Sequence, residues 1–324
     1  MATLQSTSIT GSICILNTPN SSSAGNLWFD SNSNTLRLSY CYVGGIPTGG
    51  KALNVARQGL AGAGTQAAPI VFGGTSGPIL SCTEVYSCNV WSATCALNFS
   101  RSYLAGTGTQ NAALAIGGFI TTGAACTEAY NGSSWAVGGA LITARCALAA
   151  SGTSNDALSI GGLVTPATIV NCVQAYNGSS WSTKTGTTVS RTGGAAGGNT
   201  SSTYAIGGGS PPTAQPTPAV ESYNGTSWSS ISGLITARSF LAASVSSGFG
   251  LAFGGNSIGT NAMCVECYNG STWSSYARLI TARLASAGAG TNSAAISMAG
   301  SNPGNTTCIE CYNTYNEIFV CTIP

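Results

Sequence analysis

The 324-residue sequence contains no histidine and very few charges. The lack of histidine excludes Ser-His-Asp and Cys-His catalysis, imidazole metal ligands and the commonest general base. Charged residues make up 6 % of the chain, about a quarter of the usual share, and the net charge is +2. No basic run is present, so the electrostatic footprint of a nucleic-acid-binding protein is missing. We therefore expect no nucleic-acid partner.

Other signals are missing as well. No apolar stretch approaches the roughly 18 residues of a membrane span, and "MATLQSTSITG" at the N-terminus lacks the charged and apolar regions of a secretory signal. Outside the repeat described below, the acids Asp30, Asp156 and Glu317 are scattered, which argues against a catalytic carboxylate pair. We expect no enzyme, cofactor, metal or membrane insertion. A surface poor in lysine and glutamate suits an extracellular protein or an assembled particle better than a protein of the cytosol.

The 43 % of apolar residues suffice for a core, and most of the chain is a repeat. Each copy opens on an arginine and continues through an apolar run that ends in two glycines, such as "LAIGG", or in "ISMAG" in the sixth copy. It then reaches a phrase such as "CTEAYNGSSW". The second glycine always lies 17 residues after the arginine, and the acidic position lies 17 before the next one. A fixed scaffold therefore carries one variable segment per unit. The arginines are Arg57, Arg101, Arg145, Arg191, Arg238 and Arg283.

Each unit is predicted to form four short strands. Runs of four to seven residues bounded by Gly or Asn, without helical periodicity, favour an all-β fold. Asn-Gly at 131–132, 177–178, 224–225 and 269–270 predicts type I′ hairpins between the third and fourth strands. Units of about 40–50 residues with four strands are typical of a β-propeller. We predict six four-stranded blades, with seven as the alternative.

The order Arg, Gly-Gly, Glu-x-Tyr-x4-Trp resembles the kelch repeat over residues 57–324. The resemblance implies strands a to d in each blade, with a innermost, and a ring closed by strands from both chain ends. The last unit has Glu317 where Trp is expected, and Tyr42 lies as far before Arg57 as Tyr130 lies before Arg145. The N-terminal segment is therefore predicted to complete or cap the closing blade.

The chain is divided into an N-terminal arm, 1–50, for docking or ring closure, and a propeller, 51–324. Within the arm, "GNLWFDSNSNTLRLSY" predicts a hairpin with "SNSN" as its turn. This stretch resembles the "GxLWFD…L" phrase of tail and fibre proteins of bacterial viruses. The resemblance implies docking onto other virion proteins in a multi-copy assembly.

The repeated charges are interpreted as scaffold, with one buried Arg–Glu pair in each blade. The alternative is that the arginines line a channel for an anion. In the third unit Gln174 replaces the acid, and an amide oxygen can still accept a hydrogen bond from arginine. The repeated acids are Glu84, Glu128, Glu221, Glu266 and Glu310.

The repeated tryptophans are interpreted as packing between blades, with stacking on sugars as the alternative. They are Trp91, Trp135, Trp181, Trp228 and Trp273. The sequence has 13 cysteines, five of them at one repeat position, which favours packing. Disulfides, including one between Cys88 and Cys95, and a zinc site from "CVEC" (264–267) and "CIEC" (308–311) are the alternatives.

Only the b–c loops vary in length, and in a propeller they all lie on one face. Loops on a rigid scaffold are where recognition usually resides. The longest are "GSPPTAQPTPAV" (209–220) and "LVTPATIVNC" (163–172), and the candidate binding residues are Pro211, Pro212, Gln215, Pro216, Thr165, Pro166 and Asn256. We expect this face to contact a host surface glycan or protein, or a neighbouring subunit. The alternative function is a secreted or surface-assembled filament subunit.

Overall fold

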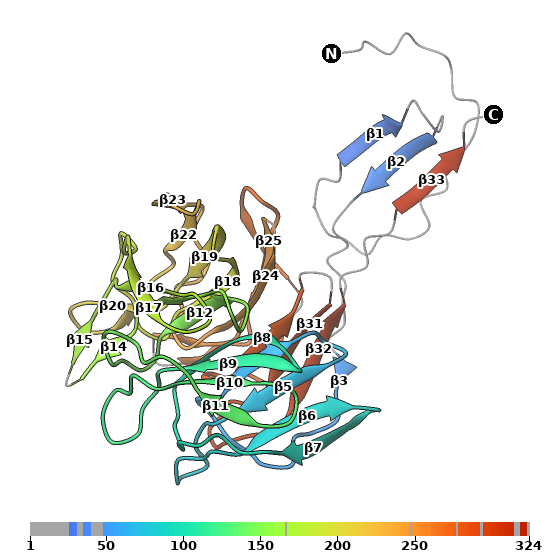
Figure 1. Cartoon of the computed structure of the whole chain (residues 1–324). Coiled ribbons are helices and arrows are strands. Elements are labelled where there is room, and N and C mark those ends of the chain that lie inside the picture. Colours follow the sequence, from blue (N-terminus) through green and yellow to red (C-terminus); the bar gives the residue numbers. More distant parts are fainter. Residues whose placement is uncertain are drawn as a thin grey trace. The chain divides into compact units, whose positions relative to one another are not determined.

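A computed structural model describes residues 26–30, 35–39, 48–165, 167–246, 248–258, 260–276, 278–291, 294–313 and 318–322. All regular structure in these ranges is β-strand (Figure 1). The chain forms two compact units, residues 44–315 and residues 1–43 together with 316–324. Within the described ranges, no helix is long and apolar enough to cross a membrane.

The larger unit is a six-bladed β-propeller of four-stranded antiparallel sheets, so the prediction of six blades is confirmed and seven is wrong. Blade 1 consists of β4 (Ala61–Gly64), β5 (Pro69–Phe72), β6 (Thr83–Ser87) and β7 (Val90–Thr94). Blade 2 consists of β8 (Ala105–Thr109), β9 (Ala112–Ile116), β10 (Thr127–Tyr130) and β11 (Trp135–Val137). Blade 3 consists of β12 (Ala149–Gly152), β13 (Ala157–Ile160), β16 (Val173–Tyr176) and β17 (Trp181–Lys184). Blade 4 consists of β18 (Ala195–Asn199), β19 (Ser202–Ile206), β22 (Val220–Tyr223) and β23 (Trp228–Ile231).

Blade 5 consists of β24 (Ala242–Ser246), β25 (Phe249–Phe253), β28 (Val265–Tyr268) and β29 (Trp273–Ser275). Blade 6 consists of β30 (Ala287–Gly290), β31 (Ala294–Met298), β32 (Ile309–Asn313) and β3 (Thr48–Gly49). The first strands of successive blades contact one another, and β30 contacts β4, so the ring is closed. The b–c loops of blades 3, 4 and 5 each carry a small hairpin. These hairpins are β14 (Leu163–Val164) with β15 (Thr168–Ile169), β20 (Gly209–Ser210) with β21 (Gln215–Pro216), and β26 (Asn256–Ser257) with β27 (Thr260–Asn261).

The innermost strands pack so closely that several positions admit no side chain. A Cβ on Gly106 of β8 would lie 2.8 Å from the Phe72 ring and 2.9 Å from the Gly62 carbonyl oxygen, both in blade 1. Real Cβ atoms do not approach that closely, so glycine is required here. The glycine and alanine content of the first strands is therefore set by crowding around the propeller axis.

The closing blade joins the two ends of the propeller sequence. Strand β3 pairs with β32 in the register Thr48↔Cys311 and Gly49↔Glu310. Trp91 of blade 1 also donates from Nε1 to the Lys51 carbonyl oxygen at 2.9 Å. The prediction that the N-terminal segment completes this blade is confirmed, and in the described part of that segment the strand consists of Thr48 and Gly49. Tyr42, used for that prediction, lies outside the described residues.

The smaller unit is a three-stranded antiparallel sheet of β1 (Asn26–Asp30), β2 (Thr35–Ser39) and β33 (Ile318–Thr322). The predicted hairpin is confirmed, because β1 and β2 pair from Asn26↔Ser39 to Asp30↔Thr35. Its "SNSN" connection and Glu317 lie outside the described residues. Strand β33 pairs with β2, so the division at residue 50 wrongly assigned the C-terminal strand to the propeller.

The Asn-Gly hairpins do not adopt the predicted type I′ turn. In blade 2 the last strand pair is Tyr130↔Trp135, so the connection has four residues, and only Gly132 among them has positive φ (95°). The Asn131 side-chain oxygen accepts hydrogen bonds from the backbone N–H groups of Ser133 (3.0 Å) and Ser134 (2.9 Å). This amide cap stabilises the longer loop and leaves Asn131 in an ordinary backbone conformation.

Candidate functional site

The repeated arginines form buried clamps inside the blades. Arg57 Nη2 lies 2.8 Å from Glu84 Oε1, and Arg101 Nη2 lies 3.0 Å from Glu128 Oε1, with all four side chains buried. Matching pairs are Arg191 with Glu221, Arg238 with Glu266, and Arg283 with Glu310. Since the guanidinium groups are buried against strand c of their own blades, these five arginines do not line a channel.

Each clamp also fixes the chain that enters the blade. Glu84 Oε2 accepts from the backbone N–H of Asn54 at 2.7 Å, and Arg57 Nη1 donates to the Cys82 carbonyl oxygen at 3.1 Å. Equivalent backbone bonds reach Glu128, Glu221, Glu266 and Glu310. Burial lowers the pKa of Arg101, and the Glu128 carboxylate opposes that shift. The clamp therefore ties the d–a connection to strand c.

Blade 3 buries its arginine without a carboxylate. Arg145 Nη2 donates to Ser159 Oγ at 2.6 Å, and Nη1 donates to the carbonyl oxygens of Gly161 and Cys172. Gln174 Oε1 instead accepts from the backbone N–H of Ile142 at 3.1 Å, so the prediction that it accepts from the arginine is wrong. The Ser159 hydroxyl accepts the hydrogen bond from Arg145 in its place. Burial lowers the pKa of Arg145.

The repeated tryptophans lie between blades. Trp135 of blade 2 meets Phe72 of blade 1 edge to face with ring centroids 4.9 Å apart, and its Nε1 donates to Thr83 Oγ1 at 3.0 Å. Trp91, Trp181, Trp228 and Trp273 are buried in the same way against residues of the preceding blade. Buried side chains in these positions cannot stack on a sugar from solvent.

The ten cysteines of the propeller unit, residues 44–315, are free thiols. A Cys88–Cys95 disulfide is incompatible with the fold, because the five-residue strand β7 separates the two by roughly 17 Å. Within the described ranges, no cluster of three Cys, Asp or Glu side chains could hold a metal ion. Burial raises the pKa of the Cys146 and Cys311 thiols.

The b–c loops share one face with the residues that follow the arginines. In blade 1, Gln58, next to Arg57, bridges Thr75, next to the two glycines. The same antiparallel bridge joins Ser102 to Phe119, Cys146 to Leu163, Thr192 to Gly209, Ser239 to Asn256, and Leu284 to Ser301. We call this surface the loop face.

A closed ring of six backbone hydrogen bonds surrounds the axis at the loop face. The N–H of each residue two positions after an arginine donates to the carbonyl oxygen of its counterpart in the preceding blade, at 2.6–2.9 Å. All six residues have positive φ, between 49° and 60°. In ring order they are Gly59, Tyr103, Ala147, Gly193, Phe240 and Ala285, so the order glycine, aromatic, alanine occurs twice.

The two aromatic side chains close the centre of this ring. Tyr103 of blade 2 and Phe240 of blade 5 meet edge to face, with ring centroids 5.8 Å apart. The glycine before each aromatic makes room for it, since a Cβ on Gly193 would lie 3.0 Å from the Phe240 ring and one on Gly59 would lie 3.2 Å from the Tyr103 ring. Burial raises the pKa of the Tyr103 phenol. We call the pair the aromatic plug.

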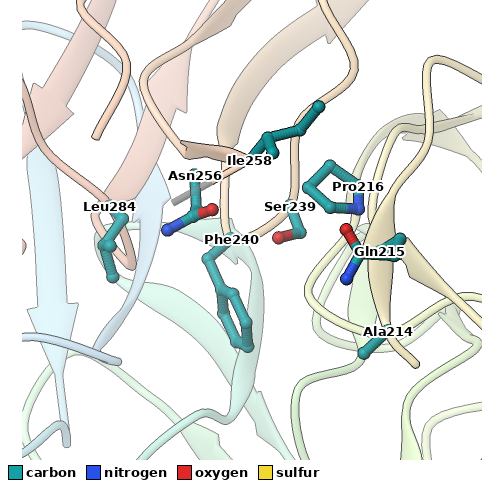
Figure 2. A pocket seen from close by; sticks show the side chains of 8 residues that line it. All are labelled: Ala214, Gln215, Pro216, Ser239, Phe240, Asn256, Ile258 and Leu284. Carbon is teal, nitrogen blue, oxygen red and sulfur yellow. The ribbon is translucent and has the colours of Figure 1, made fainter. Parts of the chain in front are cut away.

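A hollow of about 350 Å³ lies beside the plug, among blades 4, 5 and 6. Figure 2 shows the Gln215 amide facing across the hollow towards Ser239 and Phe240, with Ile258 at the upper rim. The β20–β21 hairpin contributes three residues, the d–a connections contribute three, and the b–c loop of blade 5 contributes two. They are Ala214, Gln215, Pro216, Ser239, Phe240, Leu284, Asn256 and Ile258.

The structure brings together three of the seven predicted binding residues, Gln215, Pro216 and Asn256. Pro211 and Pro212 are exposed in the turn of the same β20–β21 hairpin but do not line the hollow. Thr165 of blade 3 instead accepts from the backbone N–H of Gly123 in blade 2 at 3.3 Å. Pro166 lies outside the described residues.

Three residues of the hollow were not predicted, because they lie in the d–a connections and the prediction considered only the b–c loops. They are Ser239, Phe240 and Leu284. A signal was present in the sequence. The position two residues after each repeated arginine is glycine or alanine in four units, and aromatic only in those that carry Tyr103 and Phe240. Large residues at a position that otherwise takes small ones mark a local departure from the scaffold.

No family model matches this chain, and no curated protein matches it. The solved structure of a protein named YjhT is similar, with a TM-score of 0.70 over 84 % of this chain and 99 % of that chain. The two sequences are 12 % identical in that alignment. A likeness at this identity shows the shared propeller fold alone.

Proposed function

We propose that this protein is a non-enzymatic virion component at a tail, fibre or capsid-surface position, and that its loop face contacts the host surface or neighbouring subunits. The propeller is of the kelch type in this proposal, and residues 1–50 dock it onto other virion proteins. The observation that carries the proposal is the separation of scaffold from loops. Repeated charges and tryptophans are buried in the blades, whereas the segments of varying length gather on one face beside a hollow.

The absence of catalysis is part of the proposal. General acid–base chemistry needs a titratable side chain free to exchange protons with a substrate. In the described ranges the glutamates are held by arginines and backbone N–H groups, and Asp156 accepts from Thr200 Oγ1 at 2.6 Å in an exposed turn. With no histidine in the chain, these contacts favour a binding or structural role.

A second candidate, a self-assembling filament subunit, is favoured by the smaller unit. In the described ranges, β1 and β33 are the outer strands of its three-stranded sheet. Outer strands offer unpaired N–H and C=O groups to strands of other chains. In this second proposal the partner strand comes from another copy of the protein.

Electron cryo-microscopy of the native particle that carries the protein tests both proposals. The virion proposal expects residues 1–50 to contact a different virion protein and the hairpin at 209–216 to point outward. If that hairpin is buried against identical copies, the loop face is an assembly surface and the host-contact proposal fails. If the N-terminal residues are inserted in the next identical copy, the filament proposal replaces the first.

A further inference from the structure

Three residues that line the hollow have a strained backbone conformation. In the described ranges nine non-glycine residues have positive φ, and three of them line the hollow: Ala214 (56°), Phe240 (51°) and Ile258 (40°). Such conformations are rare for bulky or β-branched residues, and they cluster at ligand sites. Four of the six positions of the hydrogen-bonded ring hold glycine or alanine, so the ring itself does not require an aromatic residue at position 240.

The lining is polar but uncharged. Gln215, Ser239 and Asn256 supply amide and hydroxyl groups, which both donate and accept hydrogen bonds. In the described part of the chain, the side chains of Gln215 and Ser239 make no hydrogen bond with another residue, although Ser239 is only 5 % exposed. Because the Gln215 and Ser239 side chains converge on the hollow without such partners, these two groups are suited to fixing a ligand.

The remaining walls are apolar. Phe240, Pro216, Ile258 and Leu284 surround the polar groups, and Ile258 is 79 % exposed. A ligand that matches this lining is neutral, carries several hydroxyl groups and has one apolar face. A sugar ring has this combination, with axial C–H groups on one face and hydroxyls around its edge.

We propose that the hollow among blades 4, 5 and 6 binds one neutral sugar ring, whose C–H face lies on Phe240 and whose hydroxyls bond to Gln215 and Ser239. This inference rests on the proposed function, because it names the ligand class of the same loop face. The volume of about 350 Å³ is at the lower end of small-molecule sites, which suits a single ring at the end of a longer glycan.

The aromatic wall is held in place before a ligand arrives. The backbone N–H and C=O of Phe240 both belong to the hydrogen-bonded ring, Tyr103 packs against its side chain, and Gly193 lies beneath it. A side chain fixed on several sides loses little freedom when a ligand binds, which favours affinity.

The test is ligand-observed NMR and calorimetry on the purified full chain. The probes are the methyl glycosides of glucose, galactose, mannose and N-acetylglucosamine. The variants are Phe240→Ala and Gln215→Ala. Phe240→Ala is compatible with the ring, because Ala147 and Ala285 occupy the same position in other blades. Gln215 is exposed and outside the core, so its variant keeps the test valid if Phe240→Ala fails to fold.

Matched controls are Phe99→Ala, which removes an exposed aromatic of blade 2, and Gln58→Ala, which removes an amide of blade 1. We expect at least one glycoside to bind, with at least a tenfold loss in both hollow variants and a change under twofold in the controls. The inference is overturned if no glycoside binds the folded chain, or if neither hollow variant weakens binding. It is also overturned if Phe240→Ala only abolishes self-association.

This outcome is separable from the position of the protein in a particle. Failure of sugar binding with an outward-facing hairpin removes only the sugar inference. Sugar binding by the isolated chain, together with a hairpin buried in the particle, removes the host-contact proposal and leaves the site.

Discussion

Tyr103 and Phe240 come from opposite blades of the propeller and meet edge to face, with ring centroids 5.8 Å apart. Each follows a ring glycine and precedes a ring alanine, so the order Gly59, Tyr103, Ala147 is repeated as Gly193, Phe240, Ala285. The propeller therefore has a three-blade pattern at its centre in addition to its one-blade repeat. That pattern decides which blades place an aromatic side chain at the centre of the ring.

The ring glycine under Phe240 is expected to be intolerant of a side chain. Gly193→Ala places a Cβ 3.0 Å from the Phe240 ring, at a φ of 59° that L-residues avoid. We expect the free energy of unfolding to fall by about 1–3 kcal/mol, since overpacking and positive φ both cost energy. Urea denaturation followed by tryptophan fluorescence measures this change.

The control for that prediction is Ala147→Gly, at the same ring position of blade 3, where φ is 49°. Relief of strain there is expected to leave the protein as stable as the wild type or up to about 1 kcal/mol more stable. Equal destabilisation by both substitutions would contradict the account of the plug.

Introducing a carboxylate at position 174 is expected to stabilise blade 3. Gln174→Glu gives the buried Arg145 the partner that the other five arginines have. Hydrogen bonds to a charged partner contribute about 1.5–3 kcal/mol, so we expect the free energy of unfolding at neutral pH to rise by about that amount. Thermal unfolding by calorimetry is the measurement.

The reverse change in blade 2, Glu128→Gln, is expected to lower the free energy of unfolding by about 3 kcal/mol, because it leaves Arg101 buried without its carboxylate. Blade 2 has Ala115 where blade 3 has Ser159, so no hydroxyl replaces the acid. If Gln174→Glu destabilises the chain, the two clamps are not equivalent and this interpretation is wrong.

Two tryptophans at the same repeat position are expected to differ in cost. Trp181 Nε1 donates to Thr127 Oγ1 and to the Gly139 carbonyl oxygen, both at 3.0 Å. The buried Trp273 Nε1 has no partner within the described part of the chain. Trp181→Phe should therefore destabilise the protein by about 1–3 kcal/mol more than Trp273→Phe, as judged by paired urea titrations. An equal cost would show that ring volume alone determines the effect.

Stability is expected to fall under alkaline conditions. Burial raises the pKa values of the Cys82, Cys146 and Cys311 thiols and of the Tyr103 phenol. Folded-state pKa values above the unfolded ones give a stabilisation that is complete below the unfolded thiol pKa, about 8.5, and is lost as the pH rises through the folded values. Urea denaturation between pH 7 and pH 10 should show a plateau followed by a decline.

Replacement of one contributing thiol separates this linkage from general alkaline damage. Cys146→Ala removes a buried ionisable group and should make the decline shallower. Identical slopes in wild type and variant would rule out a contribution from Cys146.

Much of the architecture follows from the repeat alone. Arginine, glycine pair and acid recur at fixed separations, and equal separations produce equal strands, so the all-β class and the six blades can be predicted. The position of the scaffold charges is predictable for the same reason, because Arg101 and Glu128 occupy the places that Arg57 and Glu84 occupy one unit earlier.

The type of turn in the Asn-Gly hairpins could not be predicted from the sequence pattern. Asn-Gly favours a two-residue turn when only backbone dihedrals are considered. The observed loop is longer because the Asn131 side chain accepts two backbone hydrogen bonds, and that choice depends on the strand register at Tyr130 and Trp135. Likewise, the sequence does not show that Ser159, and not Gln174, accepts the hydrogen bond from Arg145. That choice depends on distances between side chains in the folded blade.

By itself, the sequence favoured six blades over seven and determined the order of strands within a blade and the side chains that each blade must bury, because these depend on spacing within one unit. Tertiary structure alone decided that Thr48 and Gly49 are the residues of β3 that pair with β32, that Tyr103 meets Phe240, and that Gln215 faces Ser239. Those contacts join residues of different units. They arise only once inner strands crowd around a common axis and backbone hydrogen bonds link all six blades into one ring.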